Sequence, residues 1–185
     1  MDVLDVLSEF GSTGRVESLH LGADLQELVA VYGIPWDIGR IDKRQRWPYL
    51  YSYGDVEFVV CRCRTIASIT VPTWRGTLEL PKKQTDDSAV TLPAQVTYGQ
   101  MADALAAARC PWEPLQPISG QYGLRTQPQG QRIDFTFTTD ADPEPLLHSA
   151  GTWYYAHECI SAATVTARFP DNFPAERLDA RSDTP

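Results

Sequence analysis

The sequence predicts an α+β fold made of two tandem repeats, in which each repeat is a helix followed by an antiparallel sheet. We expect the helices on one face and a concave sheet surface on the other. Two patterns predict this: a helical segment that occurs twice, and alternating strands that recur at the same shift. Of the 185 residues, 43% are hydrophobic and 22% are charged, which is typical of a folded domain and excludes disordered, collagen-like and coiled-coil chains.

The first pattern is an amphipathic helix. The segment ADLQELVAVY has apolar residues at helical spacing and stops before Gly33. A shift of 77 residues lays QMADALAAARC on it, with Leu105 on Leu28 and Gly99 on Gly22. A residue pair further along the chain supports a helix start in the second copy, because Thr97 precedes Gln100 by the three positions of a capping box.

The second pattern is a half-buried strand. Residues 56–60 and 133–137 both alternate apolar with polar or smaller residues, again 77 positions apart. Phe58 then corresponds to Phe135, and both side chains are expected to face the helices. Core truncation at either position should therefore be costly.

A third match extends the repeat with a different shift. The segment TIASITV at 65–71 resembles CISAATV at 159–165, 94 residues later. The larger shift predicts an insertion of 17 residues in the second copy, a hairpin or loop within residues 140–158. Because loops on a repeat scaffold vary without disturbing the core, we expect this insertion to determine partner specificity.

These matches define the domain organisation. A further helix before Gly11 is predicted from the apolar spacing of residues 3–10. The expected segments are an N-terminal helix plus first repeat (1–82), a polar linker (83–93), a second repeat (94–170) and a flexible tail (171–185).

The charge balance narrows the class of partner. The chain has 16 Lys and Arg against 24 Asp and Glu, a formal net charge of −8. Phosphate backbones are repelled by such a surface, so no nucleic acid is expected, whereas a basic protein is a suitable partner. The N-terminus lacks the apolar core of a signal peptide, and no stretch is long enough to cross a membrane, so we expect a cytoplasmic protein without membrane contact.

The four cysteines are expected to be reduced. Cys61 and Cys63 lie two apart on one strand, while Cys110 and Cys159 are isolated. A zinc site of four cysteines is the alternative, but this spacing is a weak zinc signature. We therefore predict no disulfide, no metal and no cofactor.

Catalytic motifs are absent from the sequence. The three histidines lie in no metal or nucleophile spacing, and there is no P-loop, dinucleotide fingerprint or G-x-S-x-G elbow. Glu57 and Asp134 occupy equivalent outward positions but lack a neighbouring nucleophile. The acidic stretch at 140–144 is interpreted as a solvated loop and not a cation site. The chain is therefore not expected to be an enzyme.

Aromatic residues are the best candidates for binding. The chain has five Trp and eight Tyr, and four aromatics alternate over residues 47–53, so they share one face of a strand. The side chains of this row either pack against the helices or form an exposed aromatic surface on the helix-free face. An exposed surface of this kind marks partner binding. The predicted partner-binding residues are Tyr49, Tyr51, Glu57, Trp74, Asp134, Trp153 and Tyr154.

A helical unit that begins L-x-L-G at Leu19 and ends G-x-P at Gly33 resembles the small outer-membrane assembly lipoproteins. Doubled, over residues 19–168, it resembles the β-lactamase inhibitory protein family. The resemblance implies two helix-plus-four-strand repeats whose joined sheets grip a target enzyme. This chain differs from that family in having no secretion signal and no hairpin-closing cysteine pairs.

The functional expectation follows from that resemblance. It is a cytoplasmic protein inhibitor, most specifically an immunity protein that neutralises a bacterial toxin by binding its basic domain. The alternatives are a small-molecule or cofactor-binding module that uses the groove between the repeats, and an enzyme of unrecognised type.

Overall fold

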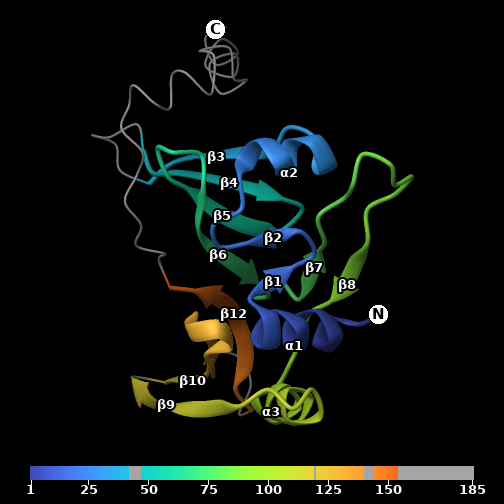
Figure 1. Ribbon diagram of the computed structural model, residues 1–185. Coiled ribbons are helices and arrows are strands. Elements are labelled where there is room, and N and C mark those ends of the chain that lie inside the picture. Colours follow the sequence, from blue (N-terminus) through green and yellow to red (C-terminus); the bar gives the residue numbers. More distant parts are fainter. Residues whose placement is uncertain (42–46, 119, 140–143, 154–185) are drawn as a thin grey trace, which may run out of the picture.

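The computed structural model describes residues 1–41, 47–118, 120–139 and 144–153. These residues form an α+β fold around an antiparallel sheet of eight described strands (Figure 1). The sheet order is β3-β4-β5-β6-β12-β11-β10-β9. Four consecutive strands thus form each half, and the last strand of each half meets the other at the centre.

The strands of the two halves are short and follow one another as meanders. The first half contains β3 Trp36–Arg40, β4 Tyr49–Tyr53, β5 Val56–Val60 and β6 Ile66–Pro72. The second half contains β9 Trp112–Ile118, β10 Gln121–Thr126, β11 Ile133–Thr138 and β12 Leu146–Thr152. A 3-10 turn, η1 Pro128–Gly130, lies between β10 and β11.

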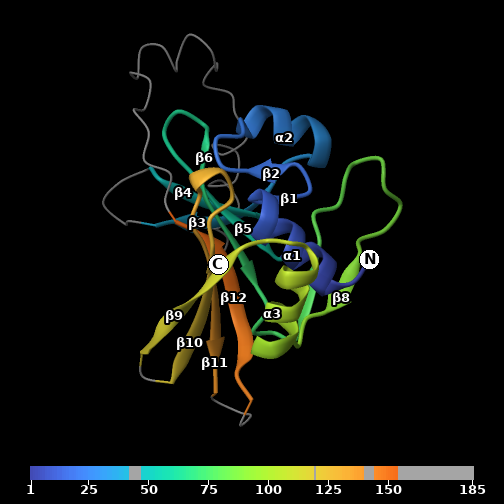
Figure 2. The same cartoon turned by 60° about the horizontal axis from the view of Figure 1, so that its bottom comes forward.

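Three helices cover one side of this sheet (Figure 2): α1 Val3–Thr13, α2 Leu25–Tyr32 and α3 Tyr98–Ala107. Each begins at a side chain that accepts a backbone N–H. The capping box predicted for α3 is confirmed, since Gln100 N donates to Thr97 Oγ1 at 3.3 Å and Thr97 N donates to Gln100 Oε1 at 2.9 Å.

Helix α1 runs past the predicted stop at Gly11. A Cβ at this position would lie 2.8 Å from Leu105 Cδ2 and 3.1 Å from Phe135 Cζ, so the glycine permits close packing of α1 on α3. The helix ends at Gly14 instead, whose φ of 74° lies in the left-handed region that favours glycine.

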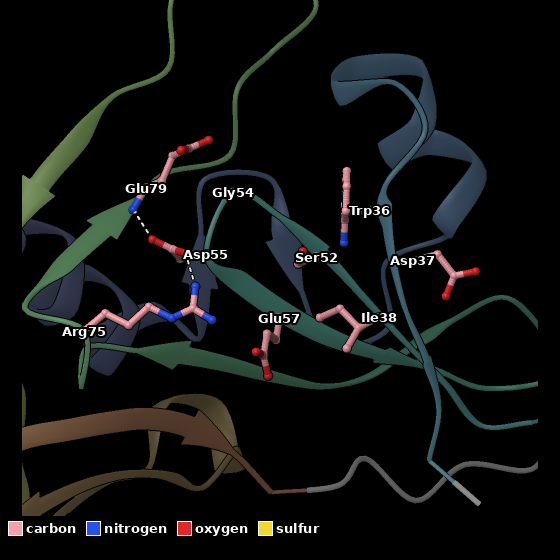
Figure 3. A pocket seen from close by; sticks show the side chains of 9 residues that line it. All are labelled: Trp36, Asp37, Ile38, Ser52, Gly54, Asp55, Glu57, Arg75 and Glu79. Carbon is pink, nitrogen blue, oxygen red and sulfur yellow. Dashed lines mark hydrogen bonds and ion pairs between the residues drawn. The ribbon is translucent and has the colours of Figure 1, made fainter. Parts of the chain in front are cut away.

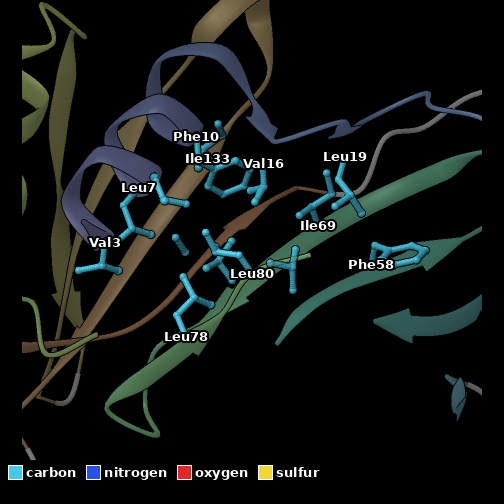
Figure 4. Close-up of a cluster of buried hydrophobic side chains, with 14 of the residues drawn as sticks. Val3, Leu7, Phe10, Val16, Leu19, Phe58, Ile69, Leu78, Leu80 and Ile133 are labelled. Carbon is cyan, nitrogen blue, oxygen red and sulfur yellow. The ribbon is translucent and has the colours of Figure 1, made fainter. Parts of the chain in front are cut away.

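The core lies between the helices and the inner face of the sheet (Figure 4). Phe10 and Leu7 of α1 are fully buried there, beside strand residues that share one parity. Phe58 and Phe135 both face this core, at 1% and 0% exposure, so the strand parity predicted from the sequence is confirmed.

The predicted linker is partly structured. Residues Thr91–Pro93 form β8, which pairs with β7 Thr77–Glu79 in a separate two-stranded sheet. Leu92 of β8 is buried in the core cluster. This burial stabilises a strand at the end of an otherwise polar segment. Another small sheet, β1 Arg15–Val16 with β2 Leu19–His20, joins α1 to α2.

The segment predicted as an inserted hairpin or loop contains a strand of the main sheet where the structure describes it. Residues Leu146–Thr152 form β12, which pairs with β11 on one side and β6 on the other. Apolar Leu147 and Ala150 face the core and hold this strand in place. The segment 159–165, which was matched to β6, lies outside the described residues. Deleting 140–158 would therefore remove a central strand and not merely a specificity loop.

Truncating either buried phenylalanine tests the core. We expect Phe58→Ala and Phe135→Ala each to lower the free energy of unfolding by about 3 to 5 kcal/mol, through lost apolar burial and a residual cavity. Urea unfolding followed by circular dichroism measures the change. Thr136→Ala, next to Phe135 on the opposite side of β11, is the control and should cost far less; a near-neutral Phe135→Ala would contradict the assigned parity.

Candidate functional site

One row of side chains crosses the helix-free side of the sheet from edge to edge. Residues that pair directly on antiparallel strands point to the same face, so the register defines the row. We call this side the outer face. Its row is Trp36, Ser52, Glu57, Thr70, Gly151, Asp134, Arg125 and Glu113.

A pocket of about 550 Å³ opens on the first-half side of this row (Figure 3). Strands β3, β4 and β5 form its floor, and Glu79 at the end of β7, with Arg75 in the turn before β7, closes one end. We call it the Glu57 pocket. It is lined by Trp36, Asp37, Ile38, Ser52, Gly54, Asp55, Glu57, Arg75 and Glu79.

Most charged groups around the Glu57 pocket have structural partners. Arg75 Nη1 lies 3.2 Å from Asp55 Oδ1, and Asp55 Oδ2 accepts from Glu79 N at 2.7 Å. Asp37 Oδ2 accepts from the Tyr49 hydroxyl at 3.1 Å. Glu57 and Glu79 are different, because neither carboxylate forms an ion pair with any residue that the structure describes. The carboxylate of Glu57, on the outer row, remains available for a cation.

Apolar side chains stand exposed around this carboxylate. Trp36 is 76% exposed and Ile38 is 44% exposed, both on the edge strand β3. Trp74, 58% exposed, borders the pocket through Arg75, whose guanidinium carbon lies 4.8 Å from the Trp74 ring centroid. The pocket thus combines the unpaired carboxylates of Glu57 and Glu79 with exposed apolar side chains.

A second cluster occupies the other half of the row. Asp134 receives two hydrogen bonds from Arg125, at 2.6 and 2.8 Å, and a third from Trp153 Nε1 at 2.6 Å. Arg132 lies over the Trp153 ring, 4.6 Å from its centroid. These contacts fix the orientation of Trp153, although 54% of its surface stays exposed.

The same contacts set the ionisation of Asp134. Burial alone would raise the pKa of this carboxyl, but the hydrogen bonds from Arg125 and Trp153 outweigh burial, and the pKa is lowered from its ordinary value. The negative charge of Asp134 is therefore neutralised by Arg125 within the protein. Its carboxylate orients Trp153 and is not open to a partner.

Four of the predicted binding residues lie where a partner could reach them. Glu57 and Asp134 are on the outer row, Trp74 borders the Glu57 pocket, and Trp153 contacts Asp134. These four therefore remain candidates for contact. The seventh predicted residue, Tyr154, lies outside the described residues.

Two predicted binding residues are misplaced. Tyr51 is 3% exposed and stacks on Phe58, with ring centroids 6.1 Å apart, while Tyr49 packs against the core. Tyr49, Tyr51 and Tyr53 face the helices, because they share the parity that pairs Tyr51 with Phe58 across the β4–β5 ladder. Tyr51 is accordingly a core residue, and Tyr49 is partly buried against the core, so neither side chain lies on the outer face.

Sequence reasoning missed Trp36, Ile38 and Arg125. Trp36 is missed because we predict no strand from the sequence at residues 36–40, where the structure has β3. The sequence does contain a signal for this strand: directly after Pro35, the apolar residues Trp36 and Ile38 flank the polar residue Asp37. Arg125 could not be found, since its role depends on the β10–β11 register.

Other chemistry has little support among the described residues. Within that part of the chain, no group of three or more His, Cys, Asp or Glu side chains is arranged to hold a metal ion. Among the described residues, Cys61, Cys63 and Cys110 are buried thiols that form no disulfide, and Cys159 lies outside the described segments. The helices of the described chain are all too short or too polar to cross a membrane.

Comparison with protein-family models, with curated proteins and with solved structures finds no match for this chain. The geometry of the outer face is thus the basis on which a function can be argued.

Replacing Asp134 tests the internal charge pair. Asp134→Asn should lower the free energy of unfolding by about 1 to 2 kcal/mol at neutral pH, because Arg125 loses an ionised partner. The folded-state pKa is depressed, so the ionised carboxylate contributes stability above the unfolded-state pKa of about 3.9. That contribution is lost as the pH falls through the folded-state value.

The measurement is urea unfolding from pH 7 downward. The difference between wild type and Asp134→Asn should shrink below about pH 4. Asp103→Asn, on the exposed side of α3, is the control and should follow the wild type throughout. A difference that grew on acidification would overturn the assignment.

Proposed function

We propose that this chain is a protein-binding inhibitor that acts by docking a basic partner on its outer face, and not by catalysis. The observation that carries the proposal is the Glu57 pocket, where the unpaired carboxylate of Glu57 lies between exposed apolar side chains. Such a mixture is suited to holding a cationic side chain of another protein.

The exposed tryptophans support a protein partner. Trp36, Trp74 and Trp153 present large apolar surfaces along or beside the outer row. Tryptophan is among the residues enriched in interface hot spots, because it buries a large area for little lost conformational entropy. Trp153 is already held by Asp134, so binding would not have to order it.

Charge complementarity supports a basic partner. The formal net charge of −8 attracts a positively charged protein at long range. At contact, the stem of a partner Lys or Arg can lie on Trp36 and Ile38 while its cation meets Glu57. Asp55 and Asp37 flank this position but are already hydrogen-bonded within the chain.

We also infer that the two halves are tandem repeats. The shift of 77 residues places Phe58 of β5 on Phe135 of β11, and each is the third strand of its half. Leu28 of α2 and Leu105 of α3 match at the same shift, and both face the core. The strand β12 begins 80 residues after β6, close to this shift, so the 17-residue insertion is not needed.

The specific form of the proposal is an immunity protein that neutralises a bacterial toxin in the cytoplasm. It rests on the resemblance to the inhibitory family and on the acidic outer face. Affinity purification from the native host tests it: recovery of one basic protein whose activity falls on mixing supports the proposal. Recovery of a protein whose activity is unaffected by this chain would contradict inhibition.

Truncation of the exposed tryptophans tests the docking face. Trp36→Ala and Trp153→Ala should each weaken binding of that partner by about 2 kcal/mol or more, chiefly through faster dissociation. Surface plasmon resonance measures both rates. Trp112→Ala is the matched control, because Trp112 has the opposite, helix-side parity on edge strand β9. Equal losses for all three variants would show that the outer face has no special role.

Charge reversal tests the pocket. Glu57→Lys should slow association and reduce its dependence on salt, since the pocket would lose the unpaired carboxylate of its floor and gain a cation. Association rates measured over a range of ionic strengths give the answer. Glu27→Lys, an equal charge change on the exposed side of α2, is the control; an identical effect of both variants would mean that only net charge matters.

A second candidate function has its own observation. A smaller pocket, of about 300 Å³, lies where the chain leaves the end of β6 beside the start of β12. Arg75, Gln95 and His148 supply polar groups to its lining. These could orient a small molecule in the groove between the halves. Native mass spectrometry of the purified chain separates the candidates: a copurified ligand lost in His148→Ala but kept in Trp36→Ala favours this second function.

A further inference from the structure

A second feature is independent of the outer-face proposal: two cysteines meet in the turn between β5 and β6. Arg64 N donates to Cys61 O at 3.0 Å, and Cys61 N donates to Thr65 O at 3.0 Å. Arg64 has a φ of 66°, which completes the tight reversal of the chain. The turn brings the side chains of Cys61 and Cys63 to the same side.

The two sulfur atoms lie 2.7 Å apart. They belong to a small cluster of their own with Ala67 and the partly buried Val59, separate from the main core. Cys63 Sγ also lies 3.3 Å from Thr65 Oγ1. Cys110 is an internal comparison, because it is also buried but its sulfur donates to the carbonyl of Gly11 at 3.3 Å.

We propose that Cys61 and Cys63 are a reversible oxidation site, at which hydrogen peroxide converts the two thiols into an intramolecular disulfide. The sulfur of one cysteine takes one oxygen of the peroxide and becomes a sulfenic acid, and the other oxygen leaves as water. The neighbouring thiol then attacks that sulfur, the S–S bond forms and a second water leaves. Two thiols and one peroxide thus give one disulfide and two waters.

The surroundings suit a small oxidant and a reduced resting state. Burial first, and then the hydrogen bond with Cys63, raise the pKa of Cys61 to about 12, so Cys61 is a neutral thiol at physiological pH and slow to react. Arg62, between the two cysteines, is exposed, whereas Cys61 and Cys63 themselves are buried. Burial of both cysteines disfavours a bulky disulfide reagent, so the oxidant proposed is the small hydrogen peroxide molecule.

The position of the pair gives the oxidation a structural consequence. Leu25 N, at the start of α2, donates to Arg64 O at 2.9 Å, and Ile66 N donates to Ala23 O at 2.9 Å. The turn therefore anchors the beginning of α2. A disulfide across it restricts the turn, so the oxidised chain should show slower amide exchange at Leu25.

Trypsin gives a direct test, because it cleaves after Arg62, between the two cysteines. The full chain is treated with hydrogen peroxide, unfolded, alkylated and digested. In the reduced chain, Cys61 and Cys63 appear in separate alkylated peptides. After oxidation we expect the peptide ending at Arg62 to be joined to the dipeptide of Cys63 and Arg64, and a reductant should separate them again.

The controls are Cys61→Ser and Cys63→Ser, in which the joined peptide must disappear, and Cys110, which should stay alkylated in the wild type. The proposal is overturned if Cys61 and Cys63 both remain alkylated at peroxide doses that oxidise the exposed Met1. It is equally overturned if either joins Cys110 or Cys159, or goes on to the sulfinic acid without forming the linked pair.

Discussion

The pairing of β6 with β12 is the contact on which the rest of the fold depends, because it alone joins the two four-stranded halves into one sheet. The ladder is short: Pro72, Val71 and Thr70 pair with Ser149, Ala150 and Gly151. Two threonine hydroxyls extend it at its ends. Thr73 Oγ1 donates to Leu147 O at 2.6 Å, and Thr152 Oγ1 accepts from Ile69 N at 2.8 Å.

This ladder also fixes which side chains share the outer face. A slip of one residue would turn every side chain of one half to the other side of the sheet, and Phe135 would then leave the core as Asp134 entered it. A side chain at Gly151 would approach Ile69 O to 3.3 Å, so a small residue belongs at this crossing. Core packing on one face thereby determines which side chains form the outer face.

How much of this could be predicted from the sequence differs between elements. The helices were predicted because caps and periodicity are local signals, as at Thr97. Strand β9 was missed because Pro114 and Pro117 argue against a strand, although prolines are tolerated on a sheet edge. Strand β12 was missed because LLHSAGT has few strand-favouring residues, and its position depends on burial between two neighbours. Tertiary context decided both cases.

The site was less predictable than the fold, because its chemistry depends on pairs distant in the chain. Glu57 and Asp134 are equivalent in sequence, yet Asp134 is held by Arg125 and Trp153 whereas Glu57 pairs with no described cation. The difference comes from β10, which supplies an arginine opposite Asp134, while β4 supplies Ser52 opposite Glu57. In the first half of the outer row Glu57 therefore has no described partner cation, whereas in the second half Asp134 orients the exposed ring of Trp153. A partner that used both would need a cation and an apolar surface on either side of the β6–β12 ladder, which is a stricter requirement than positive charge alone.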